Sequence, residues 1–356
     1  MGMTAVEKVL ARTAGCSLVR PGDVVQPTPD FIMIHDGLVR AAKRELEALG
    51  IDRLATPEKV VMVTDHEVIY GSARAAEFGV INRNAAKAWG VGRFFDVGRG
   101  GHGHIFPMES GMLSPGMFYF DNDRHSTNAG AIGAFGFRMG AEISRVLATG
   151  TNWVSVPRTV KIALAGKLKP HVYARDIGFY LARLVENGAL DFDFDYRVVE
   201  FAGDIDQFGL SERTALCNSP TELGAYGVFF PPSESILEFA QARAQQPFAP
   251  VFADADAQYE HEAVVNIGAL EPQVVLPGSI QTSVDVSEAV GQRIDHAFLG
   301  ACGSGMYEDF VVAASFLRGR RLPDHVRLFV APGTEASTRR MSTEGLIDLF
   351  LQAGAI

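Results

Sequence analysis

Four hydrophobic, strand-like runs in this chain each end in a polar cluster rich in His, Asp or Gly. In open α/β sheets, ligands bind at the carboxyl ends of parallel strands. Four clusters at four strand ends therefore predict one shared site built from distant parts of the sequence, as in an enzyme. The clusters are Asp65-His66 after VVMVT, Gly98 to His104 after RFFDV, Asp121 to His125 after MFYF, and Ala301 to Gly305 after HAFLG.

The first two clusters combine an acid/base pair with a glycine-rich loop. Asp65 and His66 suit a carboxylate that orients an imidazole for proton transfer, although an isolated Asp-His pair more often caps a turn. Residues 98–103 match the G-x-G-x-x-G pattern, but two prolines follow closely, so no long helix can begin there to bind a dinucleotide. We instead expect a glycine loop that brings its backbone and His104 close to a small ligand.

The third cluster contains Asp123, Arg124 and His125 and precedes a predicted helix start. A Ser-Thr-Asn run beginning at Ser126 supplies N-cap residue types, so we expect free N–H groups beside His125. The dipole of such a helix favours a bound carboxylate, and Arg124 adds a bidentate anion donor. The alternative is a solvated loop with an Asp–Arg salt bridge. Three ionisable groups at an anion-favouring helix start favour the functional interpretation.

Two further features gain meaning only together with these clusters. Asn218 and Glu222 lie four residues apart on a predicted helix and so share one face. Alone, they would be interpreted as surface residues. Cys302 follows a strand in a glycine-rich turn, where a single cysteine is most often a buried structural residue.

The composition indicates a globular protein and argues against several partners. The chain has 356 residues, 47% hydrophobic and 21% charged, which suits two or three domains. A formal net charge of −10 and a pI of about 5.4 are unfavourable for binding nucleic acid or an anionic membrane. The three cysteines form no CxxC pair, no apolar run could span a bilayer, and the N-terminus lacks a secretory signal, so we expect a cytoplasmic protein.

The order of the expected elements indicates an α/β fold with mainly parallel sheets. Apolar strand-like runs alternate with helical patterns, such as the amphipathic helix expected over residues 37–50. Further along, the patterns predict a long helix rich in small residues over 130–150, a β-hairpin or edge strands over 156–170, and a helix over 211–230.

Together these residues resemble the aconitase superfamily, most closely the large subunits of 3-isopropylmalate dehydratases. The similarity runs along nearly the whole chain and includes EKVLARTAG, GAIGAFG, TGTNWVSVP, CNSPTELGA and LGACGSGMYEDFVVAASFLRGR. It implies three-layer α/β/α domains with mainly parallel sheets, at residues 1–158, 159–275 and 276–356. It also implies a hydro-lyase or isomerase that acts on small hydroxy or unsaturated di- and tricarboxylates.

The resemblance also assigns roles to individual residues. Cys302 matches the family's first iron–sulfur ligand, and Arg124 stands where the family has a serine. We expect Arg124 to bind a substrate carboxylate, together with Asn218 and Ser126. The catalytic roles fall on Asp65, His66, His104, Asp123, His125 and Glu222.

The sequence departs from the family at the iron–sulfur site. The family's other cluster cysteines, in a CxxC motif, and its swivelling domain would fall beyond the last residue, and one cysteine cannot hold a [4Fe-4S] cluster. We therefore expect acid/base elimination or addition without an intact cluster, or with a single Fe or Zn ion. Such an ion would be bound by Cys302 with His66 or His104.

Two alternatives stay open at this point. A separate small-subunit partner could complete the cluster site, so that the chain would be the large subunit of a heteromeric enzyme. The chain could instead be a non-catalytic module that binds a carboxylate. A homo-oligomer is equally compatible with the sequence.

Overall fold

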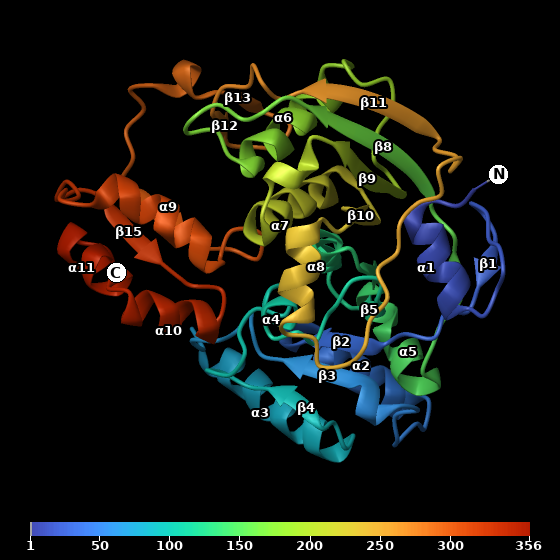
Figure 1. The fold of residues 1–356 in the computed structure, drawn as a ribbon. Helices are drawn as coiled ribbons and strands as arrows, with labels where there is room; N and C mark the ends of the chain where they lie inside the picture. Colours follow the sequence, from blue (N-terminus) through green and yellow to red (C-terminus); the bar gives the residue numbers. More distant parts are fainter. Residues whose placement is uncertain (1) are drawn as a thin grey trace.

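Three parallel sheets follow one another along the chain in the computed structural model, which describes residues 2–356 (Figure 1). The predicted α/β fold with mainly parallel sheets is confirmed. Among the described residues, antiparallel sheets are limited to two small two-stranded ones, besides one isolated antiparallel bridge between Gly101 and Thr334. The two sheets are β1 (Val24–Val25) with β7 (Val154–Ser155), and β12 (Gln273–Val275) with β13 (Ser283–Asp285). The division into domains after residues 158 and 275 stays a prediction.

The first sheet has five parallel strands in the order β4-β3-β2-β5-β6. From β2 the chain proceeds to β3 and β4 on one side, then returns to the other side of β2 for β5 and β6. The switch point therefore lies between β2 and β5, where open sheets bind ligands. The strands are β2 (Phe31–His35), β3 (Val60–Val63), β4 (Arg93–Phe95), β5 (Phe118–Asp121) and β6 (Phe135–Arg138).

Strand β2 is buried along its whole length, and the sequence analysis had not identified it. Phe31 and Met33 pack into one hydrophobic cluster, whereas Ile32 and Ile34 pack into another on the opposite face. A strand covered on both faces shows no polar alternation, which explains why its pattern was missed. The second cluster is completed by the helices α1 (Ala5–Thr13), α2 (Asp36–Ala48), α3 (Ala73–Ala88) and α5 (Ile143–Thr149).

The long helix predicted over residues 130–150 is wrong. The segment instead contains the end of the 3₁₀ helix η2 (Arg124–Ile132), then β6, then α5. Its small residues allow two backbone segments to lie close together, and they are not needed for packing between helices. Gly133 has φ 76° and ends η2, while a Cβ on Gly136 would lie 2.6 Å from the carbonyl oxygen of Ser126. Glycine is thus required here to bend the chain from η2 into β6.

The second sheet has four parallel strands in the order β10-β9-β8-β11. The hairpin or edge strands predicted over 156–170 are wrong, because β8 (Arg158–Ala165) is one inner strand, paired in parallel with β9 and β11. Its alternation arises because Ile162 and Leu164 enter the core while the other face is only partly covered. The remaining strands are β9 (Arg197–Gly203), β10 (Gly227–Phe229) and β11 (His261–Asn266), accompanied by α6 (Ala174–Glu186) and α8 (Glu234–Gln241).

The single helix predicted over residues 211–230 is divided in the structure. Helix α7 (Leu210–Asn218) ends before Pro220, the 3₁₀ helix η5 (Ser219–Leu223) follows, and Gly224 with φ 89° leads into β10. Proline lacks the N–H that would continue the α-helical ladder. Helix α7 packs against η2, and this contact joins the second sheet to the first.

The C-terminal segment has its own small core and docks on the glycine-rich loop. Strands β14 (His296–Leu299) and β15 (Arg327–Val330) pair in parallel beside α9 (Tyr307–Leu317), α10 (Glu335–Thr343) and α11 (Leu346–Ala353). The N–H of His102 donates to the carbonyl of Gly333 over 2.7 Å. The hydroxyl of Thr334 donates to Glu109 over 2.6 Å, beside the short helix α4 (Phe106–Glu109).

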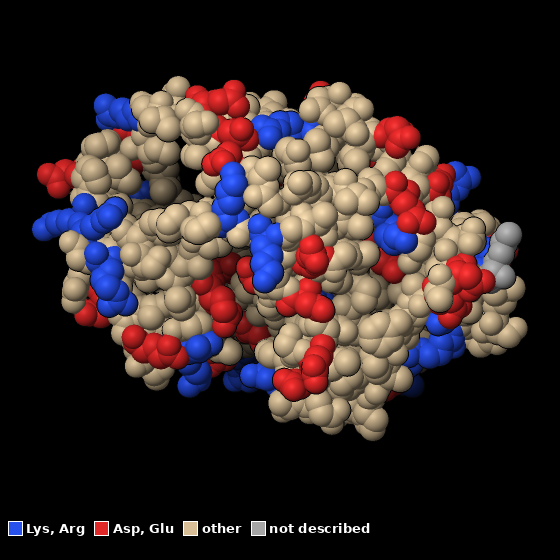
Figure 2. Space-filling view, turned by 45° about the horizontal axis from the view of Figure 1, so that its top comes forward, with Lys and Arg blue, Asp and Glu red and all other residues tan. Residues whose placement is uncertain are grey.

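The surface carries both signs of charge. On the face shown in Figure 2, Lys and Arg side chains are interspersed with Asp and Glu side chains. Within residues 2–356, no helix is both long and apolar enough to cross a lipid bilayer.

Candidate active site

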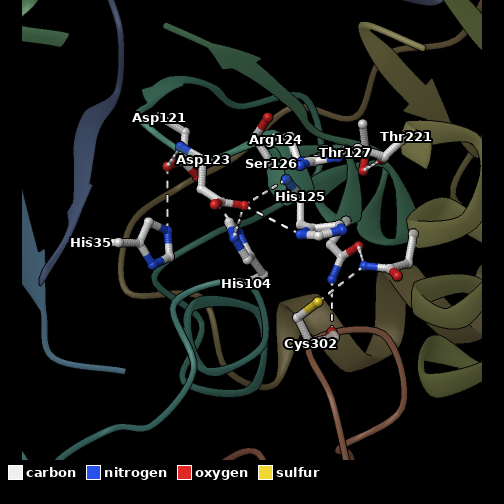
Figure 3. Close-up of polar contacts among 12 residues, drawn as sticks. His35, His104, Asp121, Asp123, Arg124, His125, Ser126, Thr127, Thr221 and Cys302 are labelled. Atoms are coloured by element: carbon white, nitrogen blue, oxygen red, sulfur yellow. Dashed lines mark hydrogen bonds and ion pairs between the residues drawn. The ribbon is translucent and has the colours of Figure 1, made fainter. Parts of the chain in front are cut away.

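The site lies at the carboxyl edge of the first sheet, at the switch point. His35 ends β2, Asp65 and His66 follow β3, and Asp121 ends β5. His104 arrives from the loop after β4. Parallel strands thus deliver residues distant in sequence to one edge, as the polar clusters predicted. The close-up in Figure 3 shows His35, His104 and His125 arranged around Asp121 and Asp123.

Asp65 is the first hub of this arrangement. Its Oδ2 lies 2.8 Å from Nδ1 of His35, and its Oδ1 lies 2.8 Å from Nδ1 of His66. The N–H of Gly103 also donates to Asp65 over 2.9 Å. Burial alone would raise the pKa of Asp65, but His35 and His66 outweigh it and hold the pKa well below its ordinary value. Asp65 is therefore a fixed negative charge that orients two imidazoles.

Asp123 is the second hub, and it caps η2. Its Oδ1 lies 3.0 Å from Nε2 of His104 and accepts the N–H of His125 over 2.8 Å. The expected helix start beside His125 is confirmed, but the capping side chain is Asp123 rather than Ser126 or its neighbours. Burial would raise the pKa of Asp123, yet the two histidines hold it well below its ordinary value.

Glu222 reaches the same histidine from the opposite side. Its Oε1 lies 3.1 Å from Nε2 of His125, and its Oε2 accepts from Arg124 over 3.1 Å. Arg124 is thus ion-paired to Glu222, and 53% of its side chain is exposed. The two carboxylates of Asp123 and Glu222 enclose His125, so this imidazole is held in one orientation.

Cys302 is held against this group by amide side chains. Nδ2 of Asn218 lies 3.3 Å from Sγ of Cys302, and Nδ2 of Asn128 donates to the Cys302 carbonyl over 2.9 Å. Nη2 of Arg175 donates to Ser304 over 2.7 Å. Among the described residues Arg175 forms no ion pair with a carboxylate. Its guanidinium is therefore available to an anionic ligand.

The charges around His125 and Cys302 set their protonation. Burial lowers the pKa of His125, but Asp123 and Cys302 have a larger, opposite effect. The net result is a pKa raised to about 10. Burial raises the pKa of Cys302, but His125, Asn218 and Arg175 bring it below its ordinary value. The structure thus favours an imidazolium beside a sulfur with thiolate character.

The structure brings most of the predicted site residues together. His125 contacts both Asp123 and Glu222, and Asn218 contacts the sulfur of Cys302. Ser126 is fully buried, with no exposed surface for a substrate. Cys302 does not belong to any of the three groups of converging metal-type ligands found among residues 2–356, and its expected pairing with His66 or His104 stays a prediction.

Two residues of the site lie outside the polar clusters of the sequence analysis: His35 at the switch point, and Arg175, which faces Ser304. Asp121 and His102 lie within the predicted clusters but received no role there, and the structure places Asp121 at the switch point and His102 beside Asp65. A histidine that closes the otherwise apolar run FIMIH was a usable signal for His35. Arg175 lies in the first turn of α6, and no local pattern distinguished it from a surface residue.

The described residues do not fit a [4Fe-4S] cluster by themselves. Such a cluster takes three or four thiolates, and only Cys302 lies at the site. Cys16 is exposed in the turn after α1, and Cys217 is fully buried, with burial raising the pKa of its thiol.

Comparison with known proteins agrees with the fold. The model of the aconitase family (aconitate hydratase) matches residues 8–293 and 289–356. The 3-isopropylmalate dehydratase large subunit 1 of Methanopyrus kandleri is 35% identical over 359 residues, covering 100% of this chain and 84% of that protein. A probable methanogen homoaconitase large subunit of Methanothermobacter thermautotrophicus is 35% identical, covering 99% of this chain and 83% of that protein.

A third relative, from Moorella thermoacetica, is a 3-isopropylmalate dehydratase large subunit with 34% identity, covering 100% of this chain and 84% of its own length. The chain therefore belongs to the aconitase family. The predicted resemblance to this family is confirmed. The prediction of an enzyme of the hydro-lyase class is confirmed as well, because the relatives are named as such enzymes.

Proposed function

We propose that the chain adds or removes water on a small hydroxy or unsaturated di- or tricarboxylate. The observation that supports this best is the position of His125, which lies between Asp123 and Glu222 and beside Cys302. Dehydration needs a proton donor for the leaving hydroxyl and a base for the carbon-bound proton. The names of the relatives, 3-isopropylmalate dehydratase and homoaconitase, indicate the substrate class.

In this proposal His125 and Cys302 divide the proton transfers. His125, held 3.1 Å from Glu222, donates a proton to the departing hydroxyl. Cys302, whose sulfur is stabilised as a thiolate by His125 and Arg175, takes the proton from the neighbouring carbon. Asp65 and His66 form a further acid/base pair on the other side of the site. An alkene carboxylate results, and readdition of water reverses the steps.

In this proposal, arginine and amide side chains of the site bind the substrate carboxylates. Arg124 is largely exposed, and Arg175 has only neutral side-chain partners, Ser304 and Asn218, among residues 2–356. A guanidinium binds a carboxylate with two parallel hydrogen bonds. The two arginines come from different segments, so a dicarboxylate that bridges them would be bound at both ends.

Formation of a conjugated alkene carboxylate tests this function. The purified chain is mixed with hydroxy di- and tricarboxylates, and ultraviolet absorbance is followed. We expect turnover that falls by about 10²- to 10⁴-fold in His125→Gln. The exposed His325→Gln is a matched control and should keep full turnover. Saturable binding without any turnover would reject the enzyme in favour of a carboxylate-binding module.

A partner chain is a second candidate that one observation favours. The relatives are named large subunits, and Cys302 is the single cysteine at the site among residues 2–356. A small subunit or further cysteines would then complete the centre. Isolation of the tagged chain from its native cells tests this, with iron and acid-labile sulfide measured in the product. Retained iron and sulfide that are lost in Cys302→Ser would support completion of a cluster. We also propose a reducing, cytoplasmic location, since the three cysteines are free.

A further inference from the structure

Three buried polar atoms at the switch point have no hydrogen-bond partner among the described residues. They are Nε2 of His35, Nδ1 of His104 and Oδ2 of Asp121. These residues are 2%, 3% and 0% exposed, respectively. Their ligand atoms lie within 4.8 Å of one another. Buried polar atoms are almost always paired, so three that converge on one point call for an occupant.

The opposite polar atom of each residue is already held in place. Nδ1 of His35 lies 2.8 Å from Asp65, and Nε2 of His104 lies 3.0 Å from Asp123. Oδ1 of Asp121 accepts the N–H of Asp123 over 3.0 Å. Histidines that bind metals usually give their other nitrogen to a carboxylate, which fixes the ring orientation. Both histidines here show that arrangement, with the free nitrogen directed towards Asp121 (Figure 3).

The separations suit a single small cation. Nε2 of His35 lies 3.3 Å from Oδ1 of Asp121, without hydrogen-bond geometry, and Nδ1 of His104 lies 3.6 Å from Oδ2. Atoms bonded to one zinc ion at about 2.0–2.1 Å stand roughly 3.4 Å apart in a tetrahedron. The two distances end on different oxygens of Asp121, but one ligand atom from each of the three residues lies within 4.8 Å of the other two, so a limited movement would bring them into one coordination sphere.

We propose that His35, His104 and Asp121 bind one divalent transition-metal ion of the zinc or iron(II) class. Two imidazoles and one carboxylate form a ligand set that suits both ions. The backbone of the glycine loop packs directly against the ring of His35. A side chain at Gly103 would prevent this, since its Cβ would lie 2.5 Å from Cε1 of His35. The site is separate from Cys302 and does not depend on the proposed hydro-lyase activity.

Two neighbouring groups of similar composition are weaker candidates. His66 and His125 each belong to a group of three converging ligands, with Asp65 and Asp123 respectively. In those groups the donors already pair with one another, over 2.8 Å for His66 and 3.3 Å for His125. Of the three groups found among residues 2–356, the one around Asp121 alone presents three unpartnered atoms at once.

A proton is the competing occupant of the site. Burial lowers the pKa of His35, but Asp65 and Asp121 together raise it well above its ordinary value. A protonated His35 could therefore bind Asp121 directly and leave no place for a metal. The experiment must separate these two occupants.

Titration of the chelator-treated full chain with Co²⁺ and Zn²⁺ makes this separation, read by calorimetry and by the visible Co²⁺ spectrum. We expect one ion per chain, and a loss of affinity of at least about tenfold in the isosteric Asp121→Asn and in His35→Gln. His66→Gln and His125→Gln each remove a ligand from one of the two neighbouring groups. These variants should bind the metal ion with the affinity of the wild type. Substrate is absent, so the result is independent of the proposed function.

Circular dichroism and thermal unfolding report whether each variant folds. If His35→Gln does not fold, the wild type and Asp121→Asn decide the question. The proposal is overturned if the wild type shows no saturable binding, which leaves a proton as the occupant. It is also overturned if Asp121→Asn binds as tightly as the wild type.

Discussion

Nε2 of His125 lies 3.1 Å from Oε1 of Glu222, although the two residues are 97 positions apart in the sequence. The contact joins η2 of the first sheet to η5 of the second. Thr127 and Thr221, whose hydroxyls lie 2.5 Å apart, form a second contact between the same two 3₁₀ helices. The orientation of the proton-donating imidazole thus depends on the packing of two sheets.

Glu222→Gln should lower turnover without unfolding the protein. The amide keeps the size of Glu222 but removes the charge that orients His125 and stabilises its protonated form. We expect kcat to fall roughly ten- to hundredfold, with a smaller change in KM, measured by steady-state kinetics. Glu238→Gln, an exposed residue on α8, is the matched control. Equal kcat values for the two variants would show that Glu222 does not act through His125.

Arg124→Ala should weaken substrate binding while the fold persists. The side chain is 53% exposed, so its loss costs little packing. Loss of a charge-assisted pair with a carboxylate corresponds to about a ten- to hundredfold rise in Kd. The same direction is expected for Arg175→Gln. Arg145→Ala, at an exposed pair with Glu142, serves as control. Calorimetry that finds unchanged affinity in Arg124→Ala would remove this residue from the substrate site.

Asp309 should make stability depend on pH. Burial raises its pKa to about 6 from 3.8, while Met306 and Ser211 donate hydrogen bonds to it. A raised pKa means that the folded state favours the neutral acid. The protonated Asp309 therefore contributes to the free energy of unfolding below about pH 4, and this contribution is lost as pH rises through about 6.

Asp309→Asn should therefore gain stability relative to wild type between about pH 4 and 7, by on the order of 1–3 kcal/mol. Urea unfolding at several pH values measures this difference, and the exposed Asp324→Asn is the control. A difference that is constant with pH would mean that Asp309 does not titrate in this window.

Gly130→Ala should distort the contact between η2 and β10. A Cβ at this position would collide with the carbonyl oxygen of Val228. We expect a loss of about 1–3 kcal/mol in the free energy of unfolding, as for overpacked cores, together with lower turnover. Gly37→Ala, in α2 with nothing within 4 Å of the new Cβ, is the paired control. It should be neutral or stabilise the protein by up to about 1 kcal/mol. Equal unfolding curves for both variants would contradict this account of η2.

The sequence located the site because apolar strands ended in polar clusters, a local pattern. Asp65, Asp123 and Cys302 could be found this way. The segment over 130–150 was misinterpreted because small residues suit both a helix and a close backbone crossing, and tertiary contacts such as that of Gly130 with Val228 distinguish them. Strand β8 was misjudged because alternation also arises in an inner strand with one partly covered face.

The finer chemistry of the site could not be read from the sequence. The neighbours of Cys302 depend on how α7 packs against η2, which places Asn218 and His125 beside the sulfur. The pairing of His35 with Asp121 follows from the strand order, which places β2 beside β5. Sequence separation alone contains no information about that order.

Deuterium incorporation tests the central claim most directly. The chain, with whatever it retains on isolation, is incubated in D₂O with unsaturated di- and tricarboxylates and followed by NMR. Our account predicts hydroxy acids that carry one deuterium on the carbon next to the new hydroxyl-bearing carbon, and loss of this product in His125→Gln. Recovery of every unsaturated acid unchanged, from a folded chain that binds it, would contradict the assignment of a hydro-lyase.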